Sequence, residues 1–380
     1  MAKNGKGRLI IGTLILAFGT WALIKNEVTR LKTASLLDTV ASSYVELEDP
    51  GVIDPALNGK IIHSIGLTST EDILTDEEFG LSANALILKR SVEYYQYEEH
   101  TKTYTESNDT RVTEYSYSIG WNNQIISSKT FYDESLRGKN VPIITLDTLT
   151  LRASEACFGA YKLPREFFTQ AEANTSDSHL DRIGVGSVSP SILAAFNERV
   201  ENAIGNSGEF VTVSDGYLYV GADPGNPQPG DVRVSYYILA PEVASIMGRI
   251  NGDSIDFVRK GGRSFGVFYT NEHPADAFLA AGEDDNQTLA WGFRVCGLIL
   301  VLIAFIMIFK GVDRRPTPVP VLSKLYKDSI FLPVVVFIVG WTAAAIGLGR
   351  VFLEPVSGVL LLLGGCGILG GFIFLKTKSS

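Results

Sequence analysis

The chain has 380 residues, 46% of them hydrophobic, and a formal net charge of −9. Residues 25–288 hold 21 basic and 39 acidic residues, so this segment alone has a formal net charge of −18. Such a segment repels nucleic acid and anionic surfaces, which excludes a nucleic-acid-binding role. Its partners are expected to be basic or neutral, or to be bound through local patches that override the field. A second interpretation of the acidic charge is that it keeps the segment soluble.

Four apolar runs divide the chain. They are Leu9–Ile24, Leu289–Phe309, Ile330–Leu348 and Val356–Leu375. A helix of about 20 residues crosses a hydrocarbon core of about 30 Å, so we expect four transmembrane helices. The first run is short and follows basic residues, as in a secretory signal peptide. Because no small-x-small cleavage site follows it, we favour a signal anchor that is retained.

Basic residues in the short flanking segments predict the orientation of the spans. They are Lys3, Lys6, Arg8, Lys310, Arg314, Arg315, Lys324, Lys327, Lys376 and Lys378. The positive-inside rule places both termini and the central loop in the cytoplasm and the acidic segment on the opposite side. The predicted order is cytoplasmic tail 1–8, transmembrane helix 9–24, extracytoplasmic or luminal domain 25–288, transmembrane helix 289–309, cytoplasmic loop 310–329, transmembrane helix 330–348, outer loop 349–355, transmembrane helix 356–375 and cytoplasmic tail 376–380.

The segment between the first two spans has the pattern of an α+β domain dominated by strands, in one lobe or in two lobes divided near residues 140–185. Residues Glu27–Tyr44 have helical spacing and predict a stalk that continues the first span. Ser189 and Pro190 predict the start of a further helix that ends before Gly205 and packs on the sheet. Strands are predicted at Lys60–Ser69, Ala85–Tyr97, Arg111–Tyr117, Gln124–Tyr132, Phe210–Val213, Tyr217–Val220, Val232–Leu239 and Ser264–Tyr269, with a turn at Gly120–Asn123.

No residue set in the sequence predicts a metal, a cofactor or a catalytic centre. The histidines, His63, His100, His179 and His273, are scattered without metal-ligand spacing. Gly262-Arg263-Ser264-Phe265-Gly266 matches the nucleophile-elbow pattern, but the residues after it favour a strand where that motif needs a helix. Cys157 is the one cysteine outside the spans, so no disulfide forms within the domain; a buried thiol or an intermolecular bond remains open.

Small residues in the last two spans predict close helix packing. Gly365–Gly370 matches a dinucleotide-binding fingerprint by letters alone, but it lies in an apolar span with no strand before it. Gly367 and Gly371 instead form a Gly-x-x-x-Gly pair, and Gly340 and Ala344 offer a matching small face.

The second span carries a charge near its outer end. Arg294 lies close to Trp291, and we expect it to extend toward the headgroups, with Trp21 and Trp291 also at the membrane interface. A single charge in this position makes a poor ion path, so a channel or transporter is not predicted.

Tyrosines gather on the two predicted strands before and after residue 100. Tyr94, Tyr95, Tyr97, Tyr115 and Tyr117 form either a contact surface or half-buried cross-strand packing, and the second reading is favoured.

The chain resembles the transmembrane protein 43 family, also called LUMA. The matching stretches are Asp54–Lys60, Leu74-Thr75-Asp76 with Phe79-Gly80, Val92–Tyr97, Tyr115–Tyr117 with Trp121, Asn226-Pro227 leading into Gly230–Tyr236, and Trp291–Arg294. The resemblance implies four spans with cytoplasmic termini. It also implies a role in organising membrane protein complexes in the endoplasmic reticulum and inner nuclear membrane, or in the cell membrane of a prokaryote. It carries over no catalytic residue.

We therefore expect a non-enzymatic membrane scaffold that acts through its extracytoplasmic domain. Its partners are the lipid bilayer, other membrane or extracytoplasmic proteins, and a second copy of the chain. Two alternatives remain: an envelope sensor that binds a ligand, and a membrane-tethered serine hydrolase that uses Ser264.

Overall fold

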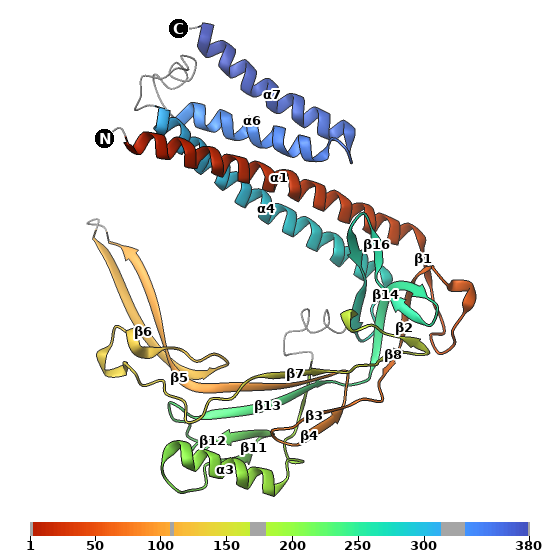
Figure 1. Cartoon of the computed structure of the whole chain (residues 1–380), viewed down its shortest axis with the longest axis vertical. Helices are drawn as coiled ribbons and strands as arrows, with labels where there is room; N and C mark the ends of the chain where they lie inside the picture. Colours follow the sequence, from red (N-terminus) through yellow and green to blue (C-terminus); the bar gives the residue numbers. More distant parts are fainter. Residues whose placement is uncertain (1–2, 107–109, 168–179, 313–330, 379–380) are drawn as a thin grey trace. The chain divides into compact units, whose positions relative to one another are not determined.

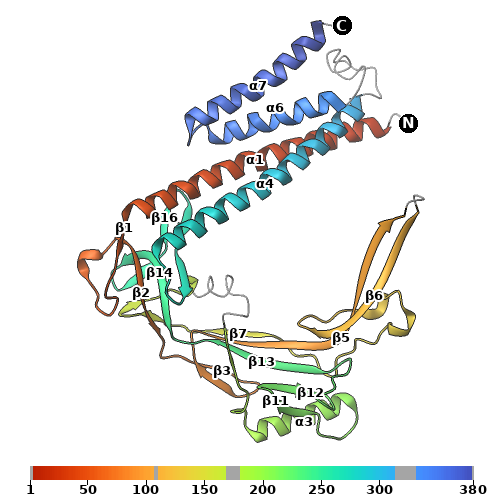
Figure 2. The ribbon, with the colours of Figure 1, turned by 180° about the vertical axis from the view of Figure 1, so that it is seen from behind.

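The computed structural model describes residues 3–106, 110–167, 180–312 and 331–378 (Figures 1 and 2). It divides into two compact units. The helical unit comprises Met1–Val45, Phe257–Phe265 and Pro274–Ser380, and the strand-rich unit comprises Glu46–Asp256 and Gly266–His273. The basic residues predicted for the cytoplasmic loop, from Arg314 to Lys327, lie outside the described residues, as do the side chains of Lys3 and Lys6.

Within the described residues, four helices are long and apolar enough to cross a membrane. They are α1 (Lys3–Ser43), α4 (Ala275–Val312), α6 (Phe331–Arg350) and α7 (Pro355–Lys378). The predicted arrangement of one N-terminal and three C-terminal spans around a strand-rich domain is confirmed. Helices α1 and α4 extend well beyond their apolar runs, and the helix expected over Glu27–Tyr44 is the second half of α1.

Helices α1 and α4 pack against each other along their length, and glycines allow the close approach. A Cβ on Gly297 of α4 would lie 2.6 Å from Leu23 of α1, and one on Gly12 of α1 would lie 2.9 Å from Ile308 of α4. Beyond the apolar runs, the Asn26 side-chain amide donates to the Ala290 carbonyl at 3.0 Å. Apolar packing and hydrogen bonds thus join the two helices on both sides of the expected membrane boundary.

Helices α6 and α7 form a hairpin whose backbones touch. A Cβ on Gly365 would lie 2.5 Å from the carbonyl oxygen of Gly340 and 2.6 Å from the amide nitrogen of Ala344, whereas no atom of the described residues outside the helix's own neighbouring turns lies within 4 Å of one on Gly367 or Gly371. Gly340 and Ala344 therefore sit at this contact, opposite Gly365 rather than Gly367 and Gly371. Gly367 is two residues after Gly365, and two residues along a helix rotate the side-chain direction by about 200°, so Gly367 lies on the opposite face of α7.

Replacing Gly365 with leucine is expected to destabilise this hairpin by about 1–3 kcal/mol, the usual cost of forcing extra volume into a packed interface. Gly367→Leu is the matched control, because its side chain would enter open space within the chain. Thermal unfolding of the purified full chain in detergent measures both. Equal losses of stability in the two variants would contradict the described helix contact.

The strand-rich unit is built on two seven-stranded sheets. The first has the order β1 (Tyr44–Glu46), β2 (Ile61–Ser69), β8 (Cys157–Phe158), β9 (Tyr161–Lys162), β15 (Ser254–Asp256), β14 (Val243–Asn251) and β18 (Val267–Thr270), and β2 also pairs with β14. The second has the order β11 (Val211–Ser214), β12 (Tyr217–Val220), β13 (Val232–Leu239), β5 (Ile87–Thr105) and β6 (Arg111–Asn122), with β10 (Asp181–Ile183) on β13 and β7 (Leu149–Arg152) on β5. Each sheet contains strands that precede residues 140–185 in the sequence and strands that follow them.

Smaller elements complete the described chain. Two short hairpins pair β3 (Ile73–Asp76) with β4 (Leu81–Asn84) and β16 (Val258–Lys260) with β17 (Arg263–Phe265). Three 3-10 turns are η1 (Pro55–Leu57), η2 (Ser128–Thr130) and η3 (Glu134–Leu136). The hairpin of β16 and β17 belongs to the helical unit, where Arg263 Nε donates to Thr33 of α1 at 2.9 Å.

The predicted strand at Gln124–Tyr132 is wrong. Strand β6 instead continues through the expected turn to Asn122, paired with Tyr94 of β5. The segment after it contains η2 and is held by side-chain amides: the amide nitrogen of Ile126 donates to Gln96 Oε1 at 2.9 Å. Side-chain bonds here replace a strand ladder, although the sequence has strand-forming residues.

The predicted helix after Ser189 is α3 (Pro190–Ile204), and its ends are as expected. The Ser189 hydroxyl accepts from the Ile192 amide, and Gly205 adopts the left-handed conformation at φ 73°. Phe196 and Val200 of α3 are buried in the core of the second sheet, which includes Leu218, Val220 and Val234. The amphipathic stripe of α3 therefore covers the sheet, as predicted.

A buried polar cluster lies beside this core. Arg90 Nη1 bonds Asp76 at 2.9 Å and Glu78 at 2.7 Å, and the Tyr236 hydroxyl donates to Asp76 at 2.6 Å. Burial raises the pKa of Tyr236, and its hydrogen bond to Asp76 adds to the effect. Burial alone would lower the pKa of Arg90, but Asp76 and Glu78 outweigh it and raise that pKa. The cluster joins three strands of the unit through charge-assisted hydrogen bonds.

Candidate functional site

The candidate site is built around Glu27, a carboxylate on α1 just beyond the first apolar run. Its side chain is completely buried, at 0% exposure. A buried carboxylate is costly unless it is paired and hydrogen-bonded. The residues that pair with it come from helices far away in the sequence, and all belong to the helical unit.

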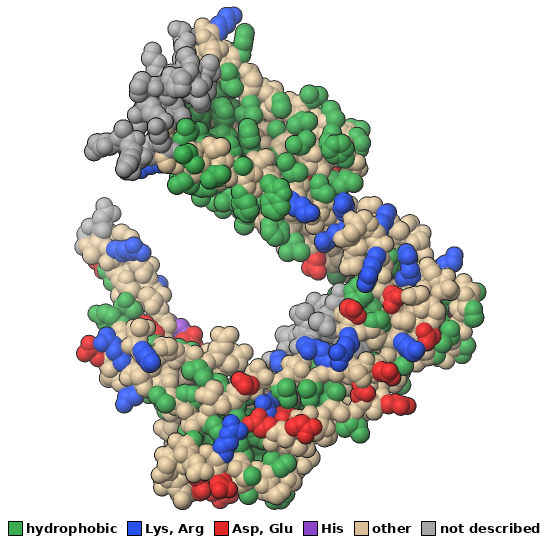
Figure 3. Space-filling model, viewed as in Figure 1, with side chains coloured by type: hydrophobic (Ala, Val, Ile, Leu, Met, Phe, Trp, Pro, Cys, Tyr) green, Lys and Arg blue, Asp and Glu red, His purple; other side chains and the backbone are tan. Residues whose placement is uncertain are grey.

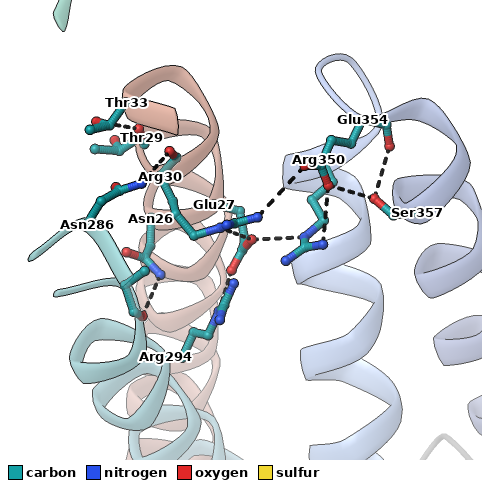
Figure 4. A network of polar contacts seen from close by, with 11 residues as sticks. Asn26, Glu27, Thr29, Arg30, Thr33, Asn286, Arg294, Arg350, Glu354 and Ser357 are labelled. Carbon is teal, nitrogen blue, oxygen red and sulfur yellow. Dashed lines mark hydrogen bonds and ion pairs between the residues drawn. The ribbon is translucent and has the colours of Figure 1, made fainter. Parts of the chain in front are cut away.

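Three guanidinium groups surround the Glu27 carboxylate (Figure 4). Arg294 Nε of α4 donates to Oε1 at 2.5 Å, and Arg350 Nε at the end of α6 donates to Oε2 at 3.0 Å. Arg30, one turn further along α1, places Nε 3.6 Å from Oε2. A single carboxylate thus joins α1, α4 and α6.

A second carboxylate extends the network to the α6–α7 turn. Glu354 lies 3.4 Å from Arg350 Nη1 and 4.0 Å from Arg30 Nη2. The Ser357 hydroxyl on α7 donates to Glu354 at 2.9 Å. Because three arginines face two glutamates, the network carries a surplus positive charge. Arg30 has the longest contacts, and its buried Nε makes no hydrogen bond within the described residues.

Neighbouring residues hold this geometry. A Cβ on Gly349 of α6 would lie 2.9 Å from both the Glu27 Cβ and the Ile24 carbonyl oxygen, so only glycine lets α6 approach α1 this closely. The guanidinium carbon of Arg294 lies 4.9 Å from the centre of the Trp291 ring, a cation–π contact. Trp341 Nε1 of α6 donates to Thr20 of α1 at 2.7 Å. The glutamate and its arginines therefore sit in a prearranged frame.

The interactions of this network are ion pairs and hydrogen bonds that connect the helices. Each hydrogen-bonding arginine donates to the carboxylate through a charge-assisted bond, and the carboxylate is shielded from water. The described residues contain no group of three His, Cys, Asp or Glu side chains able to hold a metal ion. The arrangement joins the interiors of α1 and α4 to the end of α6 and the start of α7 at one level of the bundle.

The structure gives Arg294 a different role from the expected extension toward the headgroups. Its guanidinium turns into the bundle and pairs with Glu27. Trp21 and Trp291 are exposed on the surfaces of α1 and α4, at 59% and 62%. An exposed indole at the end of a span suits the membrane interface.

The tyrosine cluster is divided between the two faces of the β5–β6 ribbon. Tyr94 is in the core, and its hydroxyl donates to the Leu146 carbonyl at 2.9 Å. Tyr95 packs against Trp121, and Tyr115 stacks on Tyr132 with ring centres 4.2 Å apart. The register of the ladder places Tyr97 and Tyr117 on that same face, since Tyr97 pairs with Ile119 and Glu99 pairs with Tyr117. The Tyr117 hydroxyl donates to Glu99 at 2.7 Å and accepts from the Asp133 amide at 2.8 Å. Residues 131–133 therefore cover the part of this face around Tyr115 and Tyr117.

Ser264 lies in strand β17, paired with Arg259 of β16. The nucleophile elbow needs a sharp strand-to-helix turn that exposes the serine hydroxyl. Here the next element after Ser264 is strand β18, so that local geometry is not formed. Cys157 is a free, half-buried thiol in β8.

Sequence reasoning missed Glu27, Arg350 and Gly349. The available signal was Arg294: an arginine inside a span calls for a partner, and the acidic residues nearest to the outer ends of the predicted spans are Glu27 and Glu354. The sequence pattern predicts for Glu27 only a place at the start of the stalk helix over Glu27–Tyr44. Its pairing could not be deduced, because hydropathy gives span limits but not which helix faces are in contact.

Comparison with known proteins places the chain in a family. The sequence model described as Transmembrane protein 43 matches residues 94–355. The chain is 26% identical to transmembrane protein 43 of Rattus norvegicus, over 98% of this chain and 90% of that protein. It is 24% identical to the Homo sapiens protein, over 77% of this chain and 70% of that protein. It is 23% identical to the homolog of Drosophila melanogaster, over 94% and 91%. No solved structure matches. The chain therefore belongs to the transmembrane protein 43 family.

Proposed function

We propose that this protein is a non-enzymatic membrane scaffold whose strand-rich unit presents surfaces to other membrane proteins. The observation that supports it most is the Glu27 network, which fixes α1, α4 and α6 at the level where α1 and α4 leave the apolar region. The strand-rich unit is inserted between these two helices in the sequence. Both of its connections therefore start from helices with a fixed spacing, which suits presentation of a surface rather than free reach.

We further propose that both termini are cytoplasmic and that the strand-rich unit lies on the opposite side. The basic residues that flank the spans support this orientation through the positive-inside rule. The membrane would be the cell membrane in a prokaryote and the endoplasmic reticulum or inner nuclear membrane in a eukaryote. The acidic charge of the inserted segment leaves neutral or basic protein surfaces as the partners.

A membrane-impermeant, lysine-reactive crosslinker tests both parts of the proposal on sealed cells or vesicles that contain the full chain. The exposed Lys102, Lys129 and Lys139 of the strand-rich unit should react, and Lys376 and Lys378 should react only after permeabilisation. Reproducible adducts with other membrane proteins are expected. The matched control replaces Lys60, Lys102, Lys129, Lys139 and Lys162, the exposed lysines described in the strand-rich unit, with arginine, which keeps the charge but removes these reactive amines.

The labelling pattern tests the orientation, and the crosslinked adducts test the scaffold role, so each part of the proposal can be contradicted independently. Labelling of Lys376 and Lys378 in sealed vesicles, with Lys102 protected, would overturn the orientation. Correct labelling with no adduct to any other protein would overturn the scaffold role instead.

A further inference from the structure

A cavity opens between α1 and α4 where both helices leave the apolar region. Its volume is about 420 Å³, and all of its lining residues belong to the helical unit. Lys25, which directly follows the first apolar run, and Leu289, which begins the second, both line it. The cavity therefore spans the boundary between hydrocarbon and headgroups, where neither a soluble ligand nor an acyl chain alone fits both ends.

One end of the cavity is strongly basic. Lys25, Arg30 and Arg263 line it, and no carboxylate is among its lining residues. Lys25 is exposed and makes no hydrogen bond or ion pair within the described chain. Within the described residues, Arg263 makes one hydrogen bond, from Nε to Thr33, so its two terminal nitrogens remain available as donors. Arg30 adds the surplus charge of the Glu27 network, and its ion pairs with Glu27 and Glu354 are long, at 3.6 Å and 4.0 Å.

The other end of the cavity is apolar. Trp21, Leu289 and Phe293 line it and are each about 60% exposed on the surface of the helices. The space-filling view shows apolar side chains in a continuous band over the spans, with basic side chains at the edge of that band (Figure 3). An apolar surface of this kind fits acyl chains, and an indole beside it suits the interface.

The wall between the two ends is fixed by cross-helix hydrogen bonds. The Asn26 side chain donates to the Ala290 carbonyl at 3.0 Å, and the Asn286 side chain donates to the Arg30 carbonyl at 3.1 Å. These amides join α1 and α4 at two levels, one at Asn26 and one at Arg30. The cavity is therefore a formed feature of the helix pair rather than a chance gap between side chains.

We propose that this cavity binds a phospholipid with an anionic headgroup, drawn from the leaflet that faces the strand-rich unit. The phosphodiester and its extra negative charge lie against Lys25, Arg30 and Arg263, and the upper acyl segments lie against Trp21, Leu289 and Phe293. A bound anion offsets the surplus positive charge of the network, in which Arg30 has only long ion pairs with Glu27 and Glu354. Such a lipid would be a structural ligand of α1 and α4, and this proposal does not depend on the scaffold role.

Native mass spectrometry of the full chain in mild detergent tests the proposal by titration with phosphatidylglycerol and, separately, with phosphatidylcholine. The chain should retain phosphatidylglycerol more strongly than phosphatidylcholine. The Lys25→Gln/Arg263→Gln variant should bind it about 25-fold more weakly, since each basic side chain near an anionic lipid contributes about fivefold. Neither residue belongs to the Glu27 network. Lys32→Gln, on the same helix but outside the cavity, should bind like the parent chain.

Two further variants and a competitor without acyl chains test which parts of the lipid and of the cavity are needed for binding. Lys25→Glu, at a side chain with no partner in the described chain, should weaken binding without disturbing the fold, and Arg263→Lys should preserve binding. Glycerol 3-phosphate, which has no acyl chains, should not displace the lipid. Equal retention of the two lipids, an unchanged affinity in Lys25→Glu, or displacement by glycerol 3-phosphate at equal concentration would each overturn the proposal.

Discussion

Replacing Glu27 with glutamine is expected to destabilise the helical unit by about 3–5 kcal/mol, the typical effect of removing one partner from a buried ion pair. Glutamine keeps the shape of the side chain but leaves Arg294 and Arg350 without their shared carboxylate. Their guanidinium groups would then repel each other inside the bundle. Thermal or denaturant unfolding of the purified full chain in detergent measures the loss.

Glu354→Gln is the matched control, because Glu354 belongs to the same network but its side chain is 44% exposed. Its ion pairs are longer and partly solvated, so the expected loss is at most about 1 kcal/mol. Combining Glu27→Gln with Arg294→Gln should cost less than the sum of the two single changes, since the pair is removed together. Similar losses for Glu27→Gln and Glu354→Gln would show that the buried carboxylate is not the centre of the network.

Replacing Asp76 with alanine is expected to destabilise the strand-rich unit by a similar amount, about 3–5 kcal/mol. Asp76 accepts from Arg90 at 2.9 Å, from the Tyr236 hydroxyl at 2.6 Å and from the Glu78 amide at 3.0 Å. Its removal leaves a buried guanidinium and a buried phenol short of an acceptor. Hydrogen exchange in β5 and β13 should accelerate, which mass spectrometry of the full chain can detect.

Glu93→Gln provides the comparison for Asp76→Ala, because Glu93 lies on β5, the strand that also carries the Asp76 partner Arg90. Glu93 pairs with Arg233 at 2.6 Å, but both side chains are partly exposed. The loss is expected to be about 1 kcal/mol or less, with little change of exchange outside the neighbouring strands. If Glu93→Gln accelerated exchange as much as Asp76→Ala, burial would not be what gives the Asp76 cluster its effect.

The spans and α3 could be predicted because their signals are local. An apolar run of the right length identifies a span, and Ser189, Pro190 and Gly205 mark the ends of α3 within one short stretch. Strands β2, β5, β11, β12 and β13 likewise followed from runs of strand-forming residues. The predicted strand at Ser264–Tyr269 became two strands, β17 and β18, that separate at Gly266.

The remaining features depend on contacts between distant residues. Strand β14, which pairs with β2 from Ile61↔Arg249 to Leu67↔Val243, was not predicted, and its main partner precedes it by about 180 residues. Helix contact by Gly365 rather than Gly367 depends on which face of α7 meets α6. Glu27 and Arg294 are 267 residues apart, so no spacing rule connects them. Composition indicates what must be buried, but only packing decides what it is buried against.

The long separation within the Glu27 network also has a consequence for biogenesis. Glu27 is synthesised 267 residues before Arg294 and 323 residues before Arg350. Until those arginines follow, the carboxylate lacks its main partners, and solvation by water or headgroups is what keeps its charge stable at the end of the first span. The first helix can therefore reach its final, dry environment only after the later helices have been inserted. Completion of the membrane domain is thus thermodynamically linked to the arrival of the C-terminal part of the chain.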